Sequence, residues 1–171
     1  MSDFLELAKA RYSCRKIAST PVAGEAIDKI IEAAIAAPTA VNKQPWRIIA
    51  IKNADLIAKM GEVTQYMFGA PFCIAVGAVR DECWVRPSDG RPFADVDAAI
   101  AATHIMMEVE ELGLATTWVA HFDVAKFKEL FPESKDWDMI ALFPIGHKAP
   151  EARPAHLHSK RRDRSELVIE K

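Results

Sequence analysis

Residues 95–113, DVDAAIAATHIMMEVEELG, decide how the rest of the chain can be arranged. Acidic residues stand at the start of this stretch and a glycine at its end, as at the two ends of a helix. Its first three turns are apolar on nearly every side, so we expect a central helix that is buried on most sides. Four alanines leave little side-chain bulk: Ala98, Ala99, Ala101 and Ala102. A second helix can therefore approach closely, and a second copy of the chain is its nearest supplier.

Helix and strand patterns alternate on both sides of this stretch. We expect further helices over residues 2–10, 23–37, 54–63 and 124–131, and strands over 47–52, 72–79, 115–119 and 139–146. The second helix carries an apolar stripe of Ile27, Ile30, Ile31, Ala34 and Ile35 and is stopped by Pro38. A long loop is expected over residues 80–94. Helices interleaved with strands indicate one α/β or α+β domain over residues 1–171, with a basic C-terminal tail over 156–171.

Composition narrows the possible functions. The chain has 171 residues, of which 50% are apolar and 27% charged, as in one globular domain with a core. A net charge of −2 gives no general attraction for nucleic acid or membrane. The start does not resemble a signal peptide, and no apolar run reaches the roughly 18 residues of a membrane span. We therefore expect a soluble, cytoplasmic protein. Its three cysteines, Cys14, Cys73 and Cys83, form no CxxC pair and are expected to be reduced thiols.

Several motifs are absent from the sequence. No two of the seven glycines have the spacing of a dinucleotide fingerprint or a P-loop, and neither a GxSxG nor an HExxH motif occurs. His156 and His158 are the only close histidine pair. Because they stand among lysines and arginines that repel a cation, we favour solvated surface over a metal site and expect no metal.

Clusters of cations are the positive signal. Arg11, Ser13 and Arg15 alternate in RYSCR (11–15), and alternate residues of an extended stretch point the same way, so they can converge on one anion. The segment KRR (160–162) offers the same chemistry. Taken alone, each cluster is more often solvated surface charge.

A polar connector, APTAVNKQPWR (37–47), joins a predicted helix to a predicted strand. Together with RYSCR it carries a resemblance to the FMN-dependent nitroreductase family, most specifically through RxSxR and PxxxNxQPW at their mutual distance. The supporting segments, in order, are DVDAAIAATHIMMEVEELGL (95–114), ATTWVAHFD (115–123), IALFPIGHKAPEARP (140–154) and KRRDRSELV (160–168). The resemblance spans almost the whole chain.

The resemblance implies an α+β (α/β three-layer) fold, with a central, mostly antiparallel sheet flanked by helices, and an intertwined homodimer. FMN would lie at the interface and be held by both chains. The implied cofactor-binding residues are Arg11, Tyr12, Ser13, Arg15, Pro38, Thr39, Asn42, Gln44, Thr117, Trp118, Ala120, Lys160 and Arg161. Residues 38–44 would reach across to the flavin of the other subunit, which accounts for the polarity of the connector. No catalytic side chain is expected, because flavin N5 carries the chemistry.

Individual roles follow from the same resemblance. Arg11, with Ser13 beside it, would bind the phosphate, and Arg15 would stabilise negative charge at flavin N1 and O2. Residues 117–120 would lie along the isoalloxazine, where a backbone N–H can donate to N5. His121 follows where several relatives carry glycine, which can bring its side chain near the ring.

Three of these positions keep alternatives. Arg162 could replace Arg161 as the second phosphate cation of the tail, and Asp163 stands where many relatives have proline. Trp118 is equally a residue of the core. Asn42, without its flanking motif, would be interpreted as a turn residue.

The reaction implied is a ping-pong transfer of electrons from NADH or NADPH through flavin N5 to a nitroaromatic, a quinone or a similar conjugated acceptor. The segments Gln65–Ala70 and Cys83–Phe93 are expected to cover the flavin. Flavin-fragmenting or dehalogenating activity is less favoured, because the chain is short. Two other classes of function remain open: a non-catalytic flavin-binding protein, such as a flavin reservoir or redox sensor, and an interaction module that uses the basic tail on an acidic partner.

Overall fold

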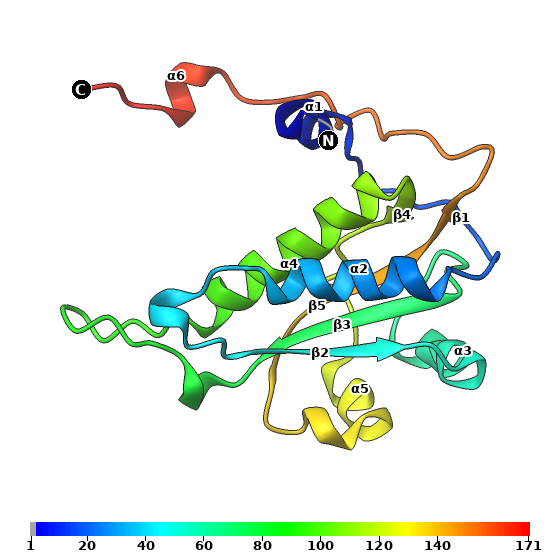
Figure 1. Ribbon diagram of the computed structural model, residues 1–171, viewed down its shortest axis with the longest axis horizontal. Helices are drawn as coiled ribbons and strands as arrows, with labels where there is room; N and C mark the ends of the chain where they lie inside the picture. Colours follow the sequence, from blue (N-terminus) through cyan, green and yellow to red (C-terminus); the bar gives the residue numbers. More distant parts are fainter. Residues whose placement is uncertain (1–2) are drawn as a thin grey trace.

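Every strand pairing among residues 3–171 is antiparallel, and the strands form one sheet in the order β1-β5-β3-β2, with β4 also pairing to β5. The computed structural model describes residues 3–171 (Figure 1). The strands are β1 (Ile17–Ala18), β2 (Trp46–Ile51), β3 (Phe72–Ala78), β4 (Leu114–Thr116) and β5 (Asp138–Lys148). The helices are α1 (Phe4–Ala10), α2 (Gly24–Ile35), α3 (Ala54–Val63), α4 (Ala94–Glu111), α5 (Val124–Leu130) and α6 (Arg164–Leu167).

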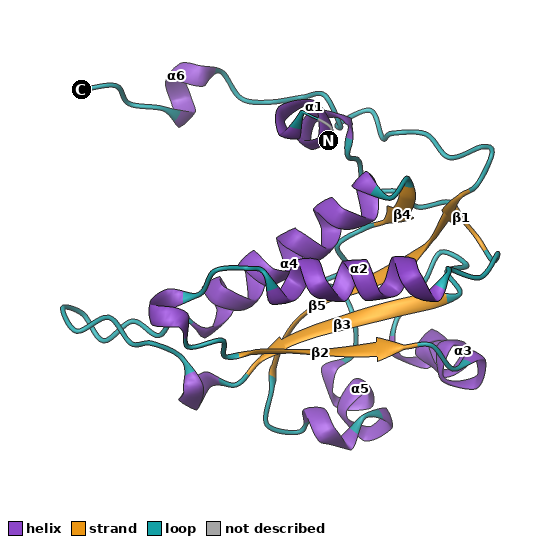
Figure 2. Cartoon of the chain, in the orientation of Figure 1, coloured by secondary structure: helices purple, strands orange, loops and turns teal. Residues whose placement is uncertain are grey.

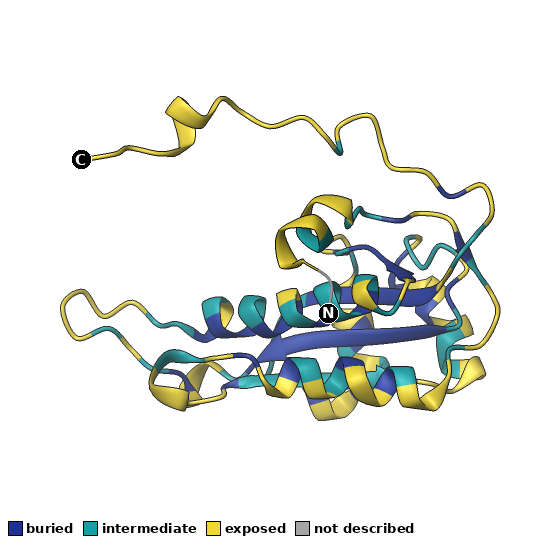
Figure 3. Ribbon diagram, turned by 45° about the horizontal axis from the view of Figure 1, so that its top comes forward, coloured by how far each residue is buried: buried dark blue, intermediate teal, exposed yellow. Residues whose placement is uncertain are grey.

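Strand β3 is buried along its whole length because both faces of the sheet are covered. Its alternate residues Ile74 and Val76 join the core under α2 and α4, whereas Cys73 and Ala75 join the core under α3 and α5. Side chains of a strand alternate between faces, so a continuous apolar run such as FCIAVGA serves two cores at once. The result is three layers, with helices on both sides of the sheet (Figures 2 and 3). The predicted fold class is therefore confirmed.

Helix α4 is the central element of the larger core. Ala98, Ala102 and Ile105 are fully buried against the sheet and α2. Nδ1 of His104 lies 3.1 Å from the carbonyl oxygen of Ala33 on α2, which shows how closely the two helices approach. The prediction of a central helix that another helix approaches closely is confirmed, but within the described chain the approaching helix is α2, and the contact with a second copy stays a prediction.

Some predicted boundaries were wrong by one to three residues, and two short elements were not predicted. Helix 54–63 has the predicted bounds, whereas β4 ends at Thr116 because the chain then leaves the sheet, returning only as a bridge from Val119 to Leu142. Ile35 does not share the buried stripe of α2 and is 61% exposed. Strand β1 and helix α6 were missed. The predicted start of the first helix at Ser2 lies outside the described residues.

Two segments of the described chain extend from the sheet and the helices that cover it. The tail after Ala152 is exposed almost throughout (Figure 3); it first passes Tyr12, whose ring lies beside that of His158, and then continues through α6 to the C-terminus. Residues 83–93 form an arm with a strand-like bridge between Val85 and Pro92. Among residues 3–171, none of the helices combines the length and the apolar character needed to cross a bilayer.

Candidate functional site

The first part of the site is a cavity of about 220 Å³, here called the anion pocket. Its lining consists of Arg11, Tyr12, Ser13, Arg15, Ala155, Leu157, His158 and Arg161. RYSCR leaves α1 at Arg11 and runs extended beside β4, where the backbone N–H of Cys14 donates to the carbonyl oxygen of Thr116 at 2.9 Å. Because Cys14 faces inward and is buried, its neighbours Ser13 and Arg15 face the cavity.

Three guanidinium groups and one hydroxyl therefore line the anion pocket, and no acidic residue belongs to this lining within the described chain. Tyr12 adds a second hydroxyl and lies edge-on to the ring of His158, with 6.1 Å between centroids. Burial, together with the neighbouring Cys14, raises the pKa of Tyr12, so its phenol stays neutral and can donate. This set of donors suits an anion with several oxygens.

The second part, here called the strand-end pocket, has a volume of about 190 Å³. Its lining consists of Arg15, Tyr66, Phe68, Thr117, Trp118, Val119, Ala120 and His121. The segment after β4 forms one wall, where Val119 is fixed by two hydrogen bonds to Leu142 of β5 at 2.9 and 3.0 Å. The ring of Trp118 packs edge-on against that of Phe143, with 5.2 Å between centroids. Trp118 therefore packs on the core and also forms a wall of the pocket. Arg15 belongs to both pockets and joins them.

The connector between α2 and β2 forms a strained, polar loop. Val41, Asn42 and Gln44 all adopt positive φ, at 51°, 56° and 50°. Asn tolerates this conformation, but a β-branched residue such as valine does so at a cost. Val41 is also 73% exposed, so its side chain gains little from packing within the chain.

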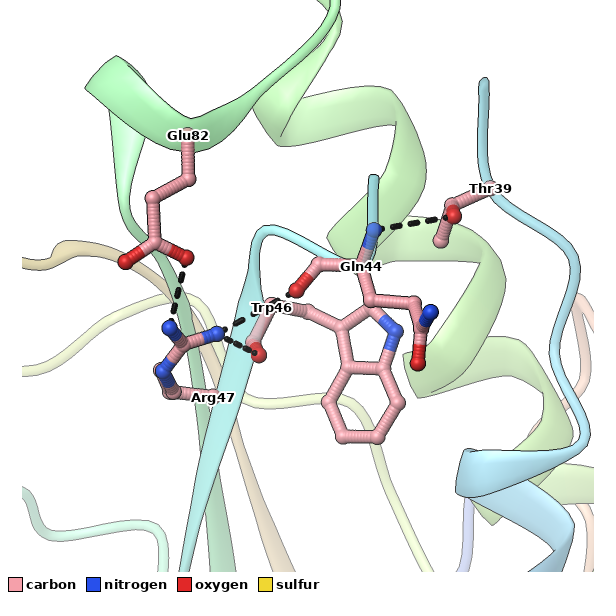
Figure 4. Close-up of polar contacts among 5 residues, drawn as sticks. All are labelled: Thr39, Gln44, Trp46, Arg47 and Glu82. Carbon is pink, nitrogen blue, oxygen red and sulfur yellow. Dashed lines mark hydrogen bonds and ion pairs between the residues drawn. The ribbon is translucent and has the colours of Figure 1, made fainter. Parts of the chain in front are cut away.

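Side-chain and backbone hydrogen bonds hold this loop in place. The backbone N–H of Gln44 donates to Oγ1 of Thr39 at 3.0 Å (Figure 4). The guanidinium of Arg47 donates to the carbonyl oxygens of Gln44 and Trp46. The same guanidinium forms an ion pair with Glu82 at 2.5 Å. The amide of Gln44 also donates to the carbonyl oxygen of Asn42 at 3.1 Å. The loop is therefore preformed.

Buried Asp97 at the start of α4 anchors the same loop. Its Oδ1 accepts a hydrogen bond of 2.9 Å from the backbone N–H of Ala40. Oδ2 of Asp97 and Nε1 of Trp46 are buried and have no hydrogen-bond partner within the described chain. Buried polar atoms without partners are uncommon and call for a group outside the chain.

The loop and the anion pocket lie at opposite ends of α4. Asp97 holds the loop at one end, and Glu110 at the other end pairs with Lys148 at 2.7 Å. The ammonium of Lys148 lies 5.4 Å from the ring centroid of Tyr12, in the anion pocket. Asp97 and Glu110 are thirteen positions apart, which is about 20 Å along a helix. One chain therefore does not bring Thr39, Asn42 and Gln44 to the residues of the anion pocket (Figure 1).

The structure separates the remaining predicted residues. Arg161 lines the anion pocket, whereas Lys160 and Arg162 do not and are exposed. Of the two segments predicted to cover the flavin, residues 65–70 supply Tyr66 and Phe68 to the strand-end pocket. The other segment, the arm 83–93, projects from the far end beside the strained loop (Figure 1).

Sequence reasoning did not assign three lining residues of the anion pocket, Ala155, Leu157 and His158, to the cofactor. The alternating AHLH pattern of the tail gave no signal, because tail residues are placed by their contact with RYSCR and not by a periodic core pattern. The histidine pair 156 and 158 belongs to this tail, and no cluster of three or more metal-binding side chains occurs among residues 3–171.

A shallow groove of about 500 Å³ runs along the outer face of α4. Its lining consists of Asp95, Val96, Ala99, Ile100, Thr103 and His104, so it is mostly apolar. Helix α1 has no buried residue, and its Phe4 and Leu5 are 70% and 58% exposed. Leu167 and Ile169 near the C-terminus are similarly bare, at 61% and 83% exposed. Apolar side chains are therefore exposed on α1, along the groove of α4 and near the C-terminus.

Comparisons with known proteins give consistent matches. The model of the "Nitroreductase family" matches residues 8–66 and 64–147. The chain is 31% identical over 155 residues to a "Putative NADH dehydrogenase/NAD(P)H nitroreductase" of Methanothermobacter thermautotrophicus, covering 86% of this chain and 78% of that protein. A solved nitroreductase family protein from Clostridium difficile 630 superposes with a TM-score of 0.89 at 34% identity, covering 99% of this chain and 98% of its own. A "putative nitroreductase in complex with FMN" from Desulfovibrio desulfuricans superposes with a TM-score of 0.79 at 25% identity, covering 100% and 98%.

Proposed function

The chain belongs to the nitroreductase family, and on that premise we propose that it is an FMN-dependent oxidoreductase that takes electrons from NAD(P)H and passes them to a conjugated acceptor. One observation carries the proposal: the cation-lined anion pocket is joined through Arg15 to the strand-end pocket. Such a pair of pockets suits a ligand with a phosphate at one end and a flat ring at the other.

The residues present fit FMN. Three arginines and two hydroxyls, without a lining carboxylate, match the charge and the acceptor oxygens of a phosphate monoester. Arg11 lines only the anion pocket and is assigned to the phosphate, together with Tyr12, Ser13 and Arg161. Lys160 is kept as a further phosphate ligand, although it lies outside this lining in one chain.

The strand-end pocket fits the ring. Thr117, Trp118 and Ala120 would lie along it, and Arg15 would place a fixed positive charge at its pyrimidine edge. FMN supplies hydride-accepting and hydride-donating chemistry when bound. The chain itself binds the cofactor, shields the ring from water through Tyr66 and Phe68, and orients the substrate. It needs no acid–base dyad for this task.

We further propose that the complete site requires a second copy of the chain. Pro38, Thr39, Asn42 and Gln44 lie about 20 Å along α4 from the anion pocket, too far to reach a ligand there within one chain. A twofold axis across the α4 groove places the end of one α4 against the start of the other, since the same patch contacts itself. The exposed apolar side chains of α1, of Leu167 and Ile169, and of the groove support this homodimer, as does the strained loop.

In this arrangement NAD(P)H and the acceptor occupy one pocket in turn, which is ping-pong exchange. The partner's arm would help to cover that pocket, because the arm and the strained loop lie at the same end of the folded molecule (Figure 1). Trp84 and Phe93 pack edge-on at 5.1 Å in this arm, so a flat aromatic or quinone acceptor has apolar surface to contact.

The test is flavin content followed by turnover. We expect the purified protein to be yellow, with about one FMN per chain, and to oxidise NAD(P)H with a nitroaromatic or a quinone. Failure of the folded protein to bind FMN in a fluorescence titration would refute the proposal. Tight FMN binding without any turnover would instead support a flavin reservoir or sensor and reject the enzyme.

A further inference from the structure

A larger cavity adjoins the strand-end pocket and is here called the side cavity. Its volume is about 460 Å³, and its lining includes Glu62, Thr64, Tyr66, His121, Asp123 and Lys126. Tyr66 and His121 belong to both linings, so their side chains form the shared wall. The two cavities therefore adjoin at these two rings.

Hydrogen bonds between its two sides fix the shape of the side cavity. Oγ1 of Thr64 donates to the carbonyl oxygen of His121 at 2.9 Å, and the N–H of Asp123 donates to the carbonyl oxygen of Val63 at 2.9 Å. The amide of Gln65 donates to the hydroxyl of Tyr66 at 3.0 Å. The ring centroids of Tyr66 and His121 lie 5.5 Å apart, tilted by 46°. The shared wall is thus an aromatic surface on a preformed frame.

The charges around the side cavity favour hydroxyls over a further phosphate. Two carboxylates, Glu62 from the end of α3 and Asp123 before α5, face one ammonium, Lys126. Oδ1 of Asp123 already accepts from the N–H of Lys126, which leaves its other oxygen available. A carboxylate accepts hydrogen bonds from ribose hydroxyls and repels a phosphate on the ribose.

We propose that the side cavity holds the adenosine half of the electron donor and selects NADH over NADPH. The adenine would lie against the rings of Tyr66 and His121, and the ribose hydroxyls would donate to Glu62 and Asp123. Lys126 is the cation available to the diphosphate bridge. The inference rests on the proposed function, because the nicotinamide must lie against a flavin ring held in the strand-end pocket for the adenosine to lie here.

Size supports the assignment. The strand-end pocket of about 190 Å³ is assigned to the flavin ring, whereas the adjoining side cavity of about 460 Å³ falls in the roughly 300–1,000 Å³ usual for ligand pockets. A dinucleotide whose nicotinamide lies on the exposed face of the flavin ring is long enough to reach the side cavity. A small quinone or nitroaromatic would lie on the ring alone, so donor and acceptor share that position while only the donor reaches the side cavity.

The direct test uses ADP-ribose and its 2′-phosphorylated counterpart, measured by calorimetry on the purified protein. Neither compound carries nicotinamide, so their binding reports on the side cavity without any redox step. We expect ADP-ribose to bind about tenfold more tightly, because the 2′-phosphate would face two carboxylates. Equal affinity, tighter binding of the phosphorylated compound, or binding of neither would overturn the proposal.

Glu62→Gln should reduce the ratio of the two affinities, ADP-ribose over its 2′-phosphorylated counterpart, by about threefold or more. The change removes one of the two repelling charges while keeping a hydrogen-bonding side chain. Glu62 is exposed at the end of α3, so the fold should tolerate the change. Glu129→Gln is the matched control: Glu129 lines the neighbouring cavity with Lys126 but not the side cavity, and its replacement should leave the ratio unchanged. An unchanged ratio in Glu62→Gln contradicts the role given to Glu62.

The two proposals can fail separately. If the protein binds FMN and oxidises NADPH as readily as NADH, the proposed function stands and the selection by the side cavity is wrong. If it binds no FMN but discriminates between the two ribose compounds, the side cavity is a nucleotide site and the oxidoreductase proposal fails.

Discussion

Val41 shows most directly that the connector before β2 is built for something other than stability. A left-handed backbone costs an L-residue roughly 1–2 kcal/mol, and a β-branched side chain is among the least suited to it. Nothing in the chain offsets that cost by packing, because the side chain is 73% exposed. Strain of this kind concentrates at binding sites. The sequence predicted a polar connector here but not its left-handed residues, since no glycine marks them.

Two arginines that look alike in RYSCR are expected to differ in function. If Arg11 contacts only the phosphate, Arg11→Ala removes a charge-assisted contact that oxidised and reduced FMN share. FMN affinity should then fall by about 1.5–3 kcal/mol, with the midpoint potential unchanged. Arg15 joins the two pockets, and a cation beside the ring stabilises the anionic reduced form more. Arg15→Ala should therefore make the potential more negative, by about 30 mV for each 1.4 kcal/mol lost.

Spectroelectrochemical titration of both variants, with FMN affinities measured in parallel, decides between these roles. Arg153→Ala is a suitable control, since this arginine is exposed and lines neither pocket. A shifted potential in Arg11→Ala with none in Arg15→Ala would reverse the assignment.

Cys73 links pH to stability at the centre of β3. Complete burial raises the pKa of its thiol from 9.0 to about 12. As the pH rises, the thiol of Cys73 therefore loses its proton in the unfolded chain before it does so in the folded chain. The contribution of this thiol to the free energy of unfolding is complete below about pH 9 and is lost as the pH rises from about 9 to 12. The slope is at most about 1.4 kcal/mol per pH unit for one proton. Urea unfolding at several alkaline pH values should show a shallower decline for Cys73→Ala than for the parent; equal slopes would contradict the buried thiol as the cause.

At the scale of elements, the sequence predicted the helices and strands that are marked by a local feature such as a capping residue or an apolar run. Helix α3 has the predicted bounds because Asn53 caps it, accepting from the backbone N–H groups of residues 55 and 56. Strand β3 is recognisable as a short apolar run after Pro71. Strand β1 has only two residues and exists because Gly146 lets it lie close to β5: a Cβ there would come within 2.5 Å of Ile17 Cγ2. Such contacts between distant segments leave no local pattern.

Asp97 is expected to stabilise the junction of α4 with the connector. Asp97→Ala leaves the backbone N–H of Ala40 without its acceptor and should lower the free energy of unfolding by about 1–3 kcal/mol. Asp97→Asn keeps an acceptor oxygen and should cost less. The measurement is chemical denaturation at fixed protein concentration.

Asp95→Ala serves as the control for this junction. Asp95 also stands in the first turn of α4 but is exposed, with Arg80 3.8 Å away, so its removal should cost no more than about 1 kcal/mol. Equal losses for the two alanine variants would indicate a helix-dipole effect and not the anchor.

At the scale of the whole molecule, only the combination of several motifs predicted which distant residues share one binding site. The structure brings RYSCR, the segment after β4 and Arg161 to one pair of pockets, although RYSCR lies more than a hundred positions before the other two. It keeps the connector at the other end of α4. The family resemblance implies this separation, since it assigns residues 38–44 to the flavin of the other subunit. Local patterns alone do not indicate it, because it follows from the length and direction of a helix whose position depends on the entire sheet.

The last prediction concerns the groove on α4. Thr103 is exposed there, and its hydroxyl donates to the carbonyl oxygen of Ala99 at 2.8 Å, so a single folded chain should tolerate arginine at this position. In a dimer built across the groove, Thr103→Arg would bring two cations close to the twofold axis in an apolar interface, where unpaired charges are costly. We expect sedimentation equilibrium to show a dimer for the parent and monomers for Thr103→Arg, with loss of FMN. Ala58→Arg on exposed α3 should remain dimeric and yellow. A parent chain that is monomeric at micromolar concentration while it holds FMN would show that one chain suffices, and the connector would then need another role.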